Sequence, residues 1–151
     1  MCIRDRYRHS IDSKGRLIIP SKFRETLRDN FIEKFWVTRG IERCIYVYTP
    51  REWNALMAKF SALPISQKMS RDFQRGLIAY AAEVECDKQG RILLPQNLLD
   101  LAGITRDVVV AGMLGRFEIW DEASWKKNQE ECANSFEQIA EQPTACLLYT
   151  S

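Results

Sequence analysis

The chain has 151 residues, of which 46% are hydrophobic and 28% are charged, and its formal net charge is +2. This composition is typical of a globular protein that buries a core, and it excludes a disordered chain. The longest apolar runs are far shorter than the roughly 20 residues that cross a bilayer. The N-terminus carries charges at Arg4, Asp5 and Arg6 with no apolar stretch after them, so we expect no secretory signal. We therefore expect a cytoplasmic protein with no membrane partner.

Five cysteines and one histidine, His9, are scattered along the sequence without a C-x-x-C pair. This pattern excludes a disulfide framework and predicts no metal site and no cofactor. Cys44 and Cys86 are expected to be small buried hydrophobes in strands. His9 is expected to be a strand residue without a ligand role.

The small net charge hides an uneven distribution along the chain. Residues 1–80 carry 16 lysines and arginines against 8 aspartates and glutamates, whereas residues 81–151 carry 6 against 12. The first part is therefore +8 and the second −6. A basic half is expected of a protein that meets phosphates, although a solvated basic face without a ligand would give the same count.

The first predicted element is a β-hairpin. Asp12-Ser13-Lys14-Gly15 has the residues of a tight turn and precedes the apolar run Leu17 to Ile19. Pro20 then suits the first turn of a helix, because its missing N–H costs nothing there. Phe23 and Leu27 lie four residues apart, on one face of that helix.

Two strands and two helices are predicted next. The strands are residues 35–38 and 44–48, joined by a loop that contains glycine. Thr49-Pro50-Arg51-Glu52 has the spacing of a capping box and opens a helix, which Pro64 ends. A second helix follows Pro64. Each of the two helices has an apolar stripe, which we assign to the core or to a subunit interface. The stripe of the first helix consists of Trp53, Leu56, Met57 and Phe60, and that of the second consists of Met69, Phe73, Leu77 and Tyr80.

The remainder of the chain repeats this order. Residues 10–20 recur as residues 85–95, with the same Asp, Gly, Arg and Pro and with aliphatic residues exchanged for one another. Pro95 opens the second short helix and Gly103 ends it. Strands follow at 108–111 and 117–120, and Asp121 caps a C-terminal helix that contains Trp125. Matching residues in the two copies are 75 residues apart at the hairpin and 72 residues apart further along. This nearly constant spacing indicates a duplicated unit.

Together these marks closely resemble the MraZ family. The marks are the hairpin sequence at 11–17 with Pro20 and Phe23-Arg24, its second copy at 87–91, and the segment 117–121 with Trp125. The resemblance covers about residues 7–140. It implies a mixed β/α fold of two tandem AbrB-like (AbrB/SpoVT) swapped-hairpin β-barrel units with flanking helices. The family's usual start before Tyr7 is replaced here by residues 1–6.

The repeat and the resemblance give an expected domain organisation. The first unit spans 7–62, a linking helix spans 63–80, the second unit spans 81–126, and a C-terminal helix and tail span 127–145. Residues 1–6 and 146–151 fit neither copy. They resemble translated sequencing-adapter sequence, and we expect them to be non-native ends.

The resemblance also implies a function. Proteins similar to MraZ are bacterial transcription factors that form ring-shaped homo-oligomers, associate with the nucleoid and bind repeated boxes in double-stranded DNA. Those boxes lie upstream of the division and cell-wall gene cluster, including the regulator's own gene. The family's D-x-x-x-R arginines are implicated in DNA contact and match Arg16 and Arg91 here.

The residues themselves favour the same partner. A two-stranded ribbon fits a major groove about 12 Å wide, and the fork of an arginine matches phosphate oxygens or the edge of guanine. The alternative is that Asp12 pairs with Arg16, and Asp87 with Arg91, only to brace a turn. The candidate DNA-binding residues are Arg8, Lys14, Arg16, Lys22, Arg24 and Arg91, and the candidate turn-bracing residues are Asp12, Gly15, Asp87 and Gly90.

An enzyme is the main competing class. The sequence contains no phosphate-binding loop, no nucleophile elbow and no H-E-x-x-H motif. Glu83, Glu85 and Asp87 alternate along one strand face, but nothing indicates a cleft around them. We therefore expect no catalytic activity. A second alternative is an oligomeric scaffold or antitoxin-like module that grips a protein with the same hairpins.

Overall fold

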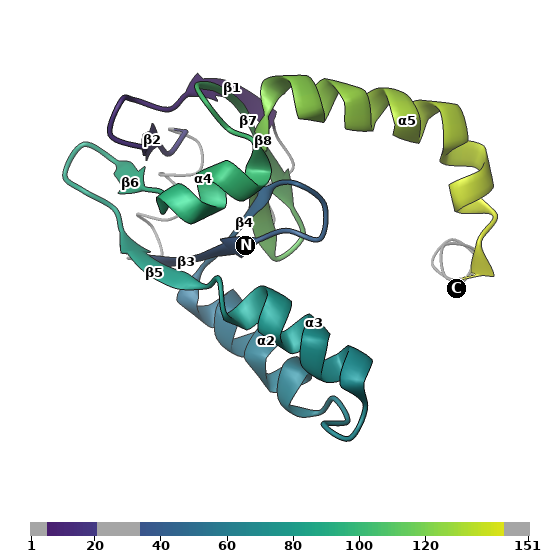
Figure 1. The fold of residues 1–151 in the computed structure, drawn as a ribbon. Coiled ribbons are helices and arrows are strands. Elements are labelled where there is room, and N and C mark those ends of the chain that lie inside the picture. Colours follow the sequence, from purple (N-terminus) through teal and green to yellow (C-terminus); the bar gives the residue numbers. More distant parts are fainter. Residues whose placement is uncertain (1–5, 21–33, 144–151) are drawn as a thin grey trace.

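The structure is a computed structural model that describes residues 6–20 and 34–143. It is a mixed β/α fold of eight described strands and four described helices (Figure 1). The strands are β1 (Arg6–Ser10), β2 (Arg16–Ile18), β3 (Lys34–Arg39), β4 (Ile45–Tyr48), β5 (Ala82–Glu85), β6 (Arg91–Leu93), β7 (Asp107–Met113) and β8 (Arg116–Asp121), and the helices are α2 (Pro50–Ser61), α3 (Lys68–Ile78), α4 (Gln96–Ala102) and α5 (Glu122–Ala140).

Six strands form one antiparallel sheet, and the other two form a separate ribbon. The order in the sheet is β1-β7-β8-β4-β3-β5, and the ribbon pairs β2 with β6. Each copy of the repeat therefore contributes strands to both layers. β1 and β5 are the edges of the larger sheet, which is open and does not close into a barrel through its described strands.

The strand order is the same from either end once the two copies are exchanged. Strands β1 to β4 of the first copy correspond to β5 to β8 of the second. When each strand is replaced by its counterpart and the order is read backwards, the same strand order is obtained. The ribbon follows the same rule, because Leu17 pairs with Ile92, its counterpart 75 residues later, at the centre of the register. The duplicated sequence thus folds as two interleaved halves around a pseudo-two-fold axis.

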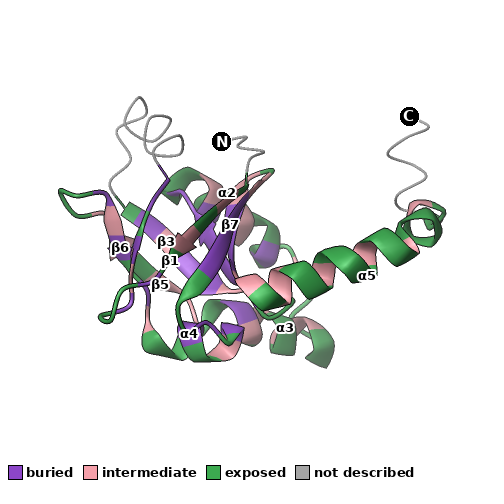
Figure 2. Cartoon of the chain, turned by 90° about the horizontal axis from the view of Figure 1, so that it is seen from above, coloured by how far each residue is buried: buried purple, intermediate pink, exposed green. Residues whose placement is uncertain are grey.

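The core lies between the sheet and the ribbon. Leu17 and Ile92 point inward from the ribbon and are fully buried with Phe35 and Phe117 from the sheet. The rings of Phe35 and Phe117, one from each copy, meet edge to face with centroids 6.0 Å apart. The other face of the sheet packs a second, aromatic cluster beneath α2, and it includes Trp53. Both faces of the central strands are therefore covered (Figure 2).

The helix boundaries follow the local signals in the sequence. The Thr49 hydroxyl accepts a hydrogen bond from the backbone N–H of Glu52 at 3.2 Å, which confirms the predicted cap of α2. Asp121 caps α5 by accepting from the N–H of Ser124 at 3.3 Å. Gly103 ends α4 with φ +65°, a conformation that suits glycine.

Three predictions need correction or lie outside the described chain. The turn after Ser10 forms as predicted, but the expected hairpin is wrong, because β1 pairs with β7 and β2 with β6. Cys44 is buried but precedes β4, and Cys86 is half-buried and follows β5, so neither is a strand residue. The helix predicted after Pro20 falls outside the described residues. Across the described segments, no helix has both the length and the apolar character that would let it cross a membrane.

Candidate nucleic-acid interface

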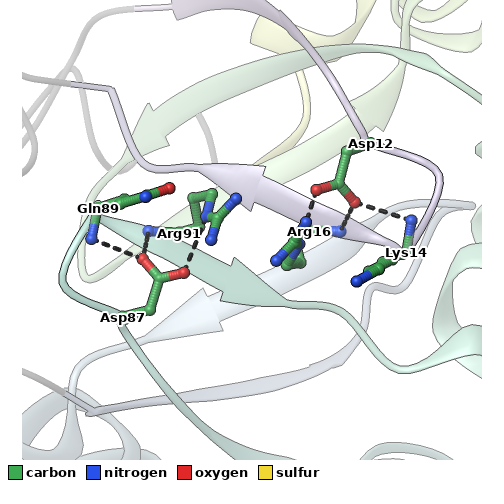
Figure 3. Close-up of polar contacts among 6 residues, drawn as sticks. All are labelled: Asp12, Lys14, Arg16, Asp87, Gln89 and Arg91. Carbon is green, nitrogen blue, oxygen red and sulfur yellow. Dashed lines mark hydrogen bonds and ion pairs between the residues drawn. The ribbon is translucent and has the colours of Figure 1, made fainter.

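The turn between β1 and β2 is held by one aspartate. Asp12 Oδ1 accepts hydrogen bonds from the backbone N–H groups of Lys14 and Arg16, both at 2.9 Å. Asp12 Oδ2 accepts from Arg16 Nε at 2.7 Å. The carboxylate therefore satisfies the turn and orients the guanidinium at the same time (Figure 3). In the structure Asp12 thus contacts both the backbone of the turn and the side chain of Arg16.

The second copy repeats this geometry almost atom for atom. Asp87 Oδ1 accepts from the N–H groups of Gln89 and Arg91 at 2.9 Å, and Oδ2 accepts from Arg91 Nε at 2.8 Å. Gly15 and Gly90 occupy equivalent turn positions with φ +84° and +78°. A side chain at either position would be strained, because L residues with a Cβ rarely adopt this conformation. Bracing is thus common to both copies.

Hydrogen bonding lowers the pKa of both turn carboxyls. The pKa of Asp12 lies below its ordinary value of 3.8, chiefly because its carboxylate accepts from the backbone N–H of Arg16, with a further contribution from the side chain of Arg16. The pKa of Asp87 is lowered for the same reason, chiefly because its carboxylate accepts from the backbone N–H of Arg91. A lowered pKa means that the ionised carboxylate is the form that stabilises the folded turn.

A pH titration tests this account. The stabilisation from Asp12 should be complete above its unfolded-state pKa and should be lost as the pH falls through the lower folded-state pKa. Carbon-detected NMR titration of the side-chain carboxyl measures that value directly. In Arg16→Ala the backbone N–H remains, so the pKa of Asp12 should rise only part of the way to normal. Titration of Asp12 at or above 3.8 in the wild type would contradict the bracing geometry.

The pairing of β2 with β6 places both arginines on one small surface. Arg16 is opposite Leu93, and Ile18 is opposite Arg91. Because side chains alternate along a strand, these four point outward while Leu17 points into the core. We call this surface the ribbon face, formed by Arg16, Ile18, Arg91 and Leu93. Among the described residues, the Nη groups of its two arginines have no hydrogen-bond partner.

The other predicted cations lie in different places. Lys14 is exposed in the turn beside the ribbon face (Figure 3). Arg8 is on edge strand β1, with its side chain 74% exposed and its Nη1 3.9 Å from Glu122 Oε1. Arg8 therefore belongs to the six-stranded sheet, whereas the ribbon face belongs to β2 and β6. Lys22 and Arg24 lie outside the described residues.

Two features of the site were not predicted. Ile18 and Leu93 are 46% and 56% exposed, so the ribbon face is partly apolar. Alternation along the two short strands could have indicated this, but only once their pairing was known. An ion pair also links the half-buried Arg116 to the buried Glu118 at 2.7 Å, and Arg116 lies over the ring of Tyr46. That pair lies in β8 within the six-stranded sheet, and we assign it to sheet packing.

The acidic residues on β5 are paired with a lysine. Glu83 and Glu85 are exposed at the edge of the sheet, and Lys34 Nζ lies 3.5 Å from a carboxylate oxygen of each. Over residues 6–20 and 34–143, no three His, Cys, Asp or Glu side chains converge into a metal-binding group. The charged groups that the ribbon face itself presents are the guanidinium groups of Arg16 and Arg91.

Fold and site together define a class: a duplicated β/α protein with pseudo-two-fold symmetry that presents two braced arginines on one ribbon. The family described as "MraZ protein, putative antitoxin-like" matches residues 3–76 and again residues 77–145. A protein of Natranaerobius thermophilus named "Transcriptional regulator MraZ" is 47% identical over 136 residues, which cover 90% of this chain and 92% of that protein. One of the same name from Acetivibrio thermocellus is 49% identical over 135 residues, covering 89% and 92%. The chain belongs to the MraZ family.

Proposed function

We propose that this protein is a DNA-binding transcriptional regulator and that the ribbon face makes the DNA contact. The observation that carries the proposal is the pair of arginines, Arg16 and Arg91, that are held at Nε by aspartates while their Nη donors point to no described partner. A guanidinium fixed in this way can donate two parallel hydrogen bonds without first losing side-chain freedom. The names of the relatives support this function.

The size and charge of the ribbon fit a groove of double-stranded DNA. Two-stranded ribbons enter the major groove in several regulators, and base edges there offer paired acceptors to arginine. Lys14 lies in the adjoining turn, where it would reach the phosphate backbone. Arg8, Lys22 and Arg24 are proposed as further phosphate contacts, and these would add affinity more than sequence preference.

The finer part of the proposal follows the family. We propose two swapped-hairpin units of the AbrB/SpoVT class, at residues 7–62 and 81–126, and the interleaved pairing of β2 with β6 supports this assignment. We further propose a nucleoid-associated cytoplasmic protein that forms a ring-shaped homo-oligomer. The ring would bind repeated promoter boxes upstream of the division and cell-wall genes, including its own. Several copies in one ring raise the effective concentration of each contact, so that weak single sites suffice.

Binding measured against salt tests the proposal. The wild-type chain should bind the duplex upstream of its own gene with an affinity that falls steeply as salt rises, because phosphate contacts release counterions. Fluorescence anisotropy between about 50 and 200 mM salt gives the slope, and a scrambled duplex of equal length is the control. Equal affinity for both duplexes would contradict sequence-specific regulation, and no binding at low salt would contradict DNA binding altogether.

A second candidate function is capture of a protein partner by the same ribbon. The observation in its favour is the exposure of Ile18 and Leu93 beside the two arginines. Apolar side chains between cations suit an amphipathic protein surface better than a phosphate backbone. In that case affinity for the partner should depend weakly on salt and should fall in Ile18→Ser, whereas DNA binding should depend strongly on salt.

A further inference from the structure

Charged and aliphatic side chains alternate over the ribbon face. Across the two strands, Leu93 lies opposite Arg16, and Ile18 lies opposite Arg91. Along each strand, the aliphatic residue is two positions from the arginine of the same copy. Cβ atoms that face each other across an antiparallel pair are about 5 Å apart, and residues two positions apart along a strand are about 7 Å apart. Each aliphatic side chain therefore starts within about 7 Å of both arginines.

Burial in the core does not account for these two aliphatic residues. Leu17 and Ile92, the central residues of β2 and β6, are buried and fill the space beneath the ribbon. Ile18 and Leu93 point the other way, where they are 46% and 56% exposed. Outward-facing positions of an antiparallel pair are usually polar, yet both copies of the repeat carry an aliphatic residue at this equivalent position. The core thus explains the middle of the ribbon but not its outer aliphatic pair.

The floor of the DNA major groove offers a matching pattern. Guanine presents the paired acceptors O6 and N7, which suit an arginine, and thymine presents an apolar C5-methyl group. Successive base pairs are about 3.4 Å apart along the helix axis. The separation of about 5–7 Å between an arginine and its aliphatic neighbour therefore corresponds to one or two base-pair steps. A ribbon that places its arginines on guanines brings its aliphatic side chains over neighbouring base pairs.

We propose that Ile18 and Leu93 recognise thymine, and that each packs on the C5-methyl group of a thymine one or two base pairs from a guanine bound by an arginine of the ribbon face. This inference rests on the DNA contact proposed above and adds the base that the ribbon face selects beside guanine. Loss of one methyl group from an apolar contact weakens binding about fourfold, so two such contacts amount to about 15-fold. The aliphatic pair would thus contribute sequence preference, whereas Lys14 in the adjoining turn would favour any duplex.

Replacement of thymine by uracil in the duplex tests the proposal. Uracil pairs with adenine as thymine does and lacks only the C5-methyl group, so the protein itself stays unchanged. Fluorescence anisotropy at one salt concentration compares the duplex upstream of the chain's own gene with the same duplex in which every thymine is uracil. The uracil duplex should bind the wild type about 4- to 15-fold more weakly. Equal affinity for both would overturn the thymine contact and leave DNA binding standing, whereas binding to neither would overturn the DNA-binding function and this inference with it.

A double variant shows whether these two side chains carry the discrimination. Ile18→Ala/Leu93→Ala should bind the thymine duplex more weakly than the wild type does, and it should bind the two duplexes about equally, because both methyl contacts are gone. Ile41→Ala is the matched control: Ile41 is 69% exposed between β3 and β4, and its variant should discriminate as the wild type does. Circular dichroism shows whether each variant is folded. Undiminished discrimination by the double variant would mean that uracil acts through the shape of the duplex or through other residues, and would overturn the proposal.

Discussion

Arg16→Ala should weaken binding to the promoter duplex by about 10- to 100-fold, the range expected for one well-oriented arginine contact to a base pair. This loss of affinity should exceed the loss caused by replacing most other single lysines or arginines. The reason is that Asp12 holds the Arg16 guanidinium in place through Nε at 2.7 Å. Fluorescence anisotropy at one fixed salt concentration measures the change. Circular dichroism shows whether the variant is still folded.

Two companion variants separate the possible roles of the arginines. Arg91→Ala should weaken binding similarly, because the proposed contact uses both arginines of the ribbon face; an unchanged affinity would limit the contact to the first copy. Arg75→Ala is the matched control, because Arg75 is an exposed arginine of α3 that pairs with Asp72 at 3.1 Å, away from the ribbon. Equal affinity of wild type and Arg16→Ala for the duplex would show that Arg16 does not contact the DNA.

The second large effect concerns stability. Leu17→Ala should lower the free energy of unfolding by roughly 2–5 kcal/mol, because it leaves a cavity at a side chain with 0% exposure. Leu17 lies opposite Ile92 at the pseudo-two-fold axis, so the cavity opens between the two halves of the molecule. Urea denaturation followed by far-ultraviolet circular dichroism, at one protein concentration, gives the difference.

Leu114→Ala removes the same atoms from an exposed site. Leu114 is 71% exposed, so its variant should stay within about 0.5 kcal/mol of the wild type. A cost for Leu17→Ala no greater than that for Leu114→Ala would contradict the core described above. The interleaved halves should also unfold together, so tryptophan fluorescence and circular dichroism should report coincident transitions for Leu17→Ala.

Local chemistry explains which predictions succeeded. The turns at Asp12 and Asp87, the cap at Thr49 and the αL end of α4 at Gly103 all depend on residues a few positions apart. Such contacts form within one short segment whatever the rest of the chain does. The pairing of Asp12 with Arg16, which the sequence offered as an alternative to DNA contact, is of this local kind, because the carboxylate and the guanidinium are only four residues apart.

The hairpin prediction failed for the opposite reason. A turn between two apolar runs normally joins strands that pair with each other, but here the strand after the turn, β2, pairs with β6, its counterpart in the other copy of the repeat, 75 residues away. The exposed positions of Ile18 and Leu93 depend on that pairing, as does the shared face of Arg16 and Arg91. No short-range pattern could have given these positions.

The residues in chain order are enough to show that the chain is a duplicated β/α protein, where most of its described elements begin and end, and which aspartates hold its turns. The interleaving of the two copies, the shared ribbon of the two arginines and the projection of α5 from the body become visible only in the folded chain. Turns and caps are set by neighbouring residues. Strand pairing and helix docking are instead set by burying surface between segments far apart in the chain.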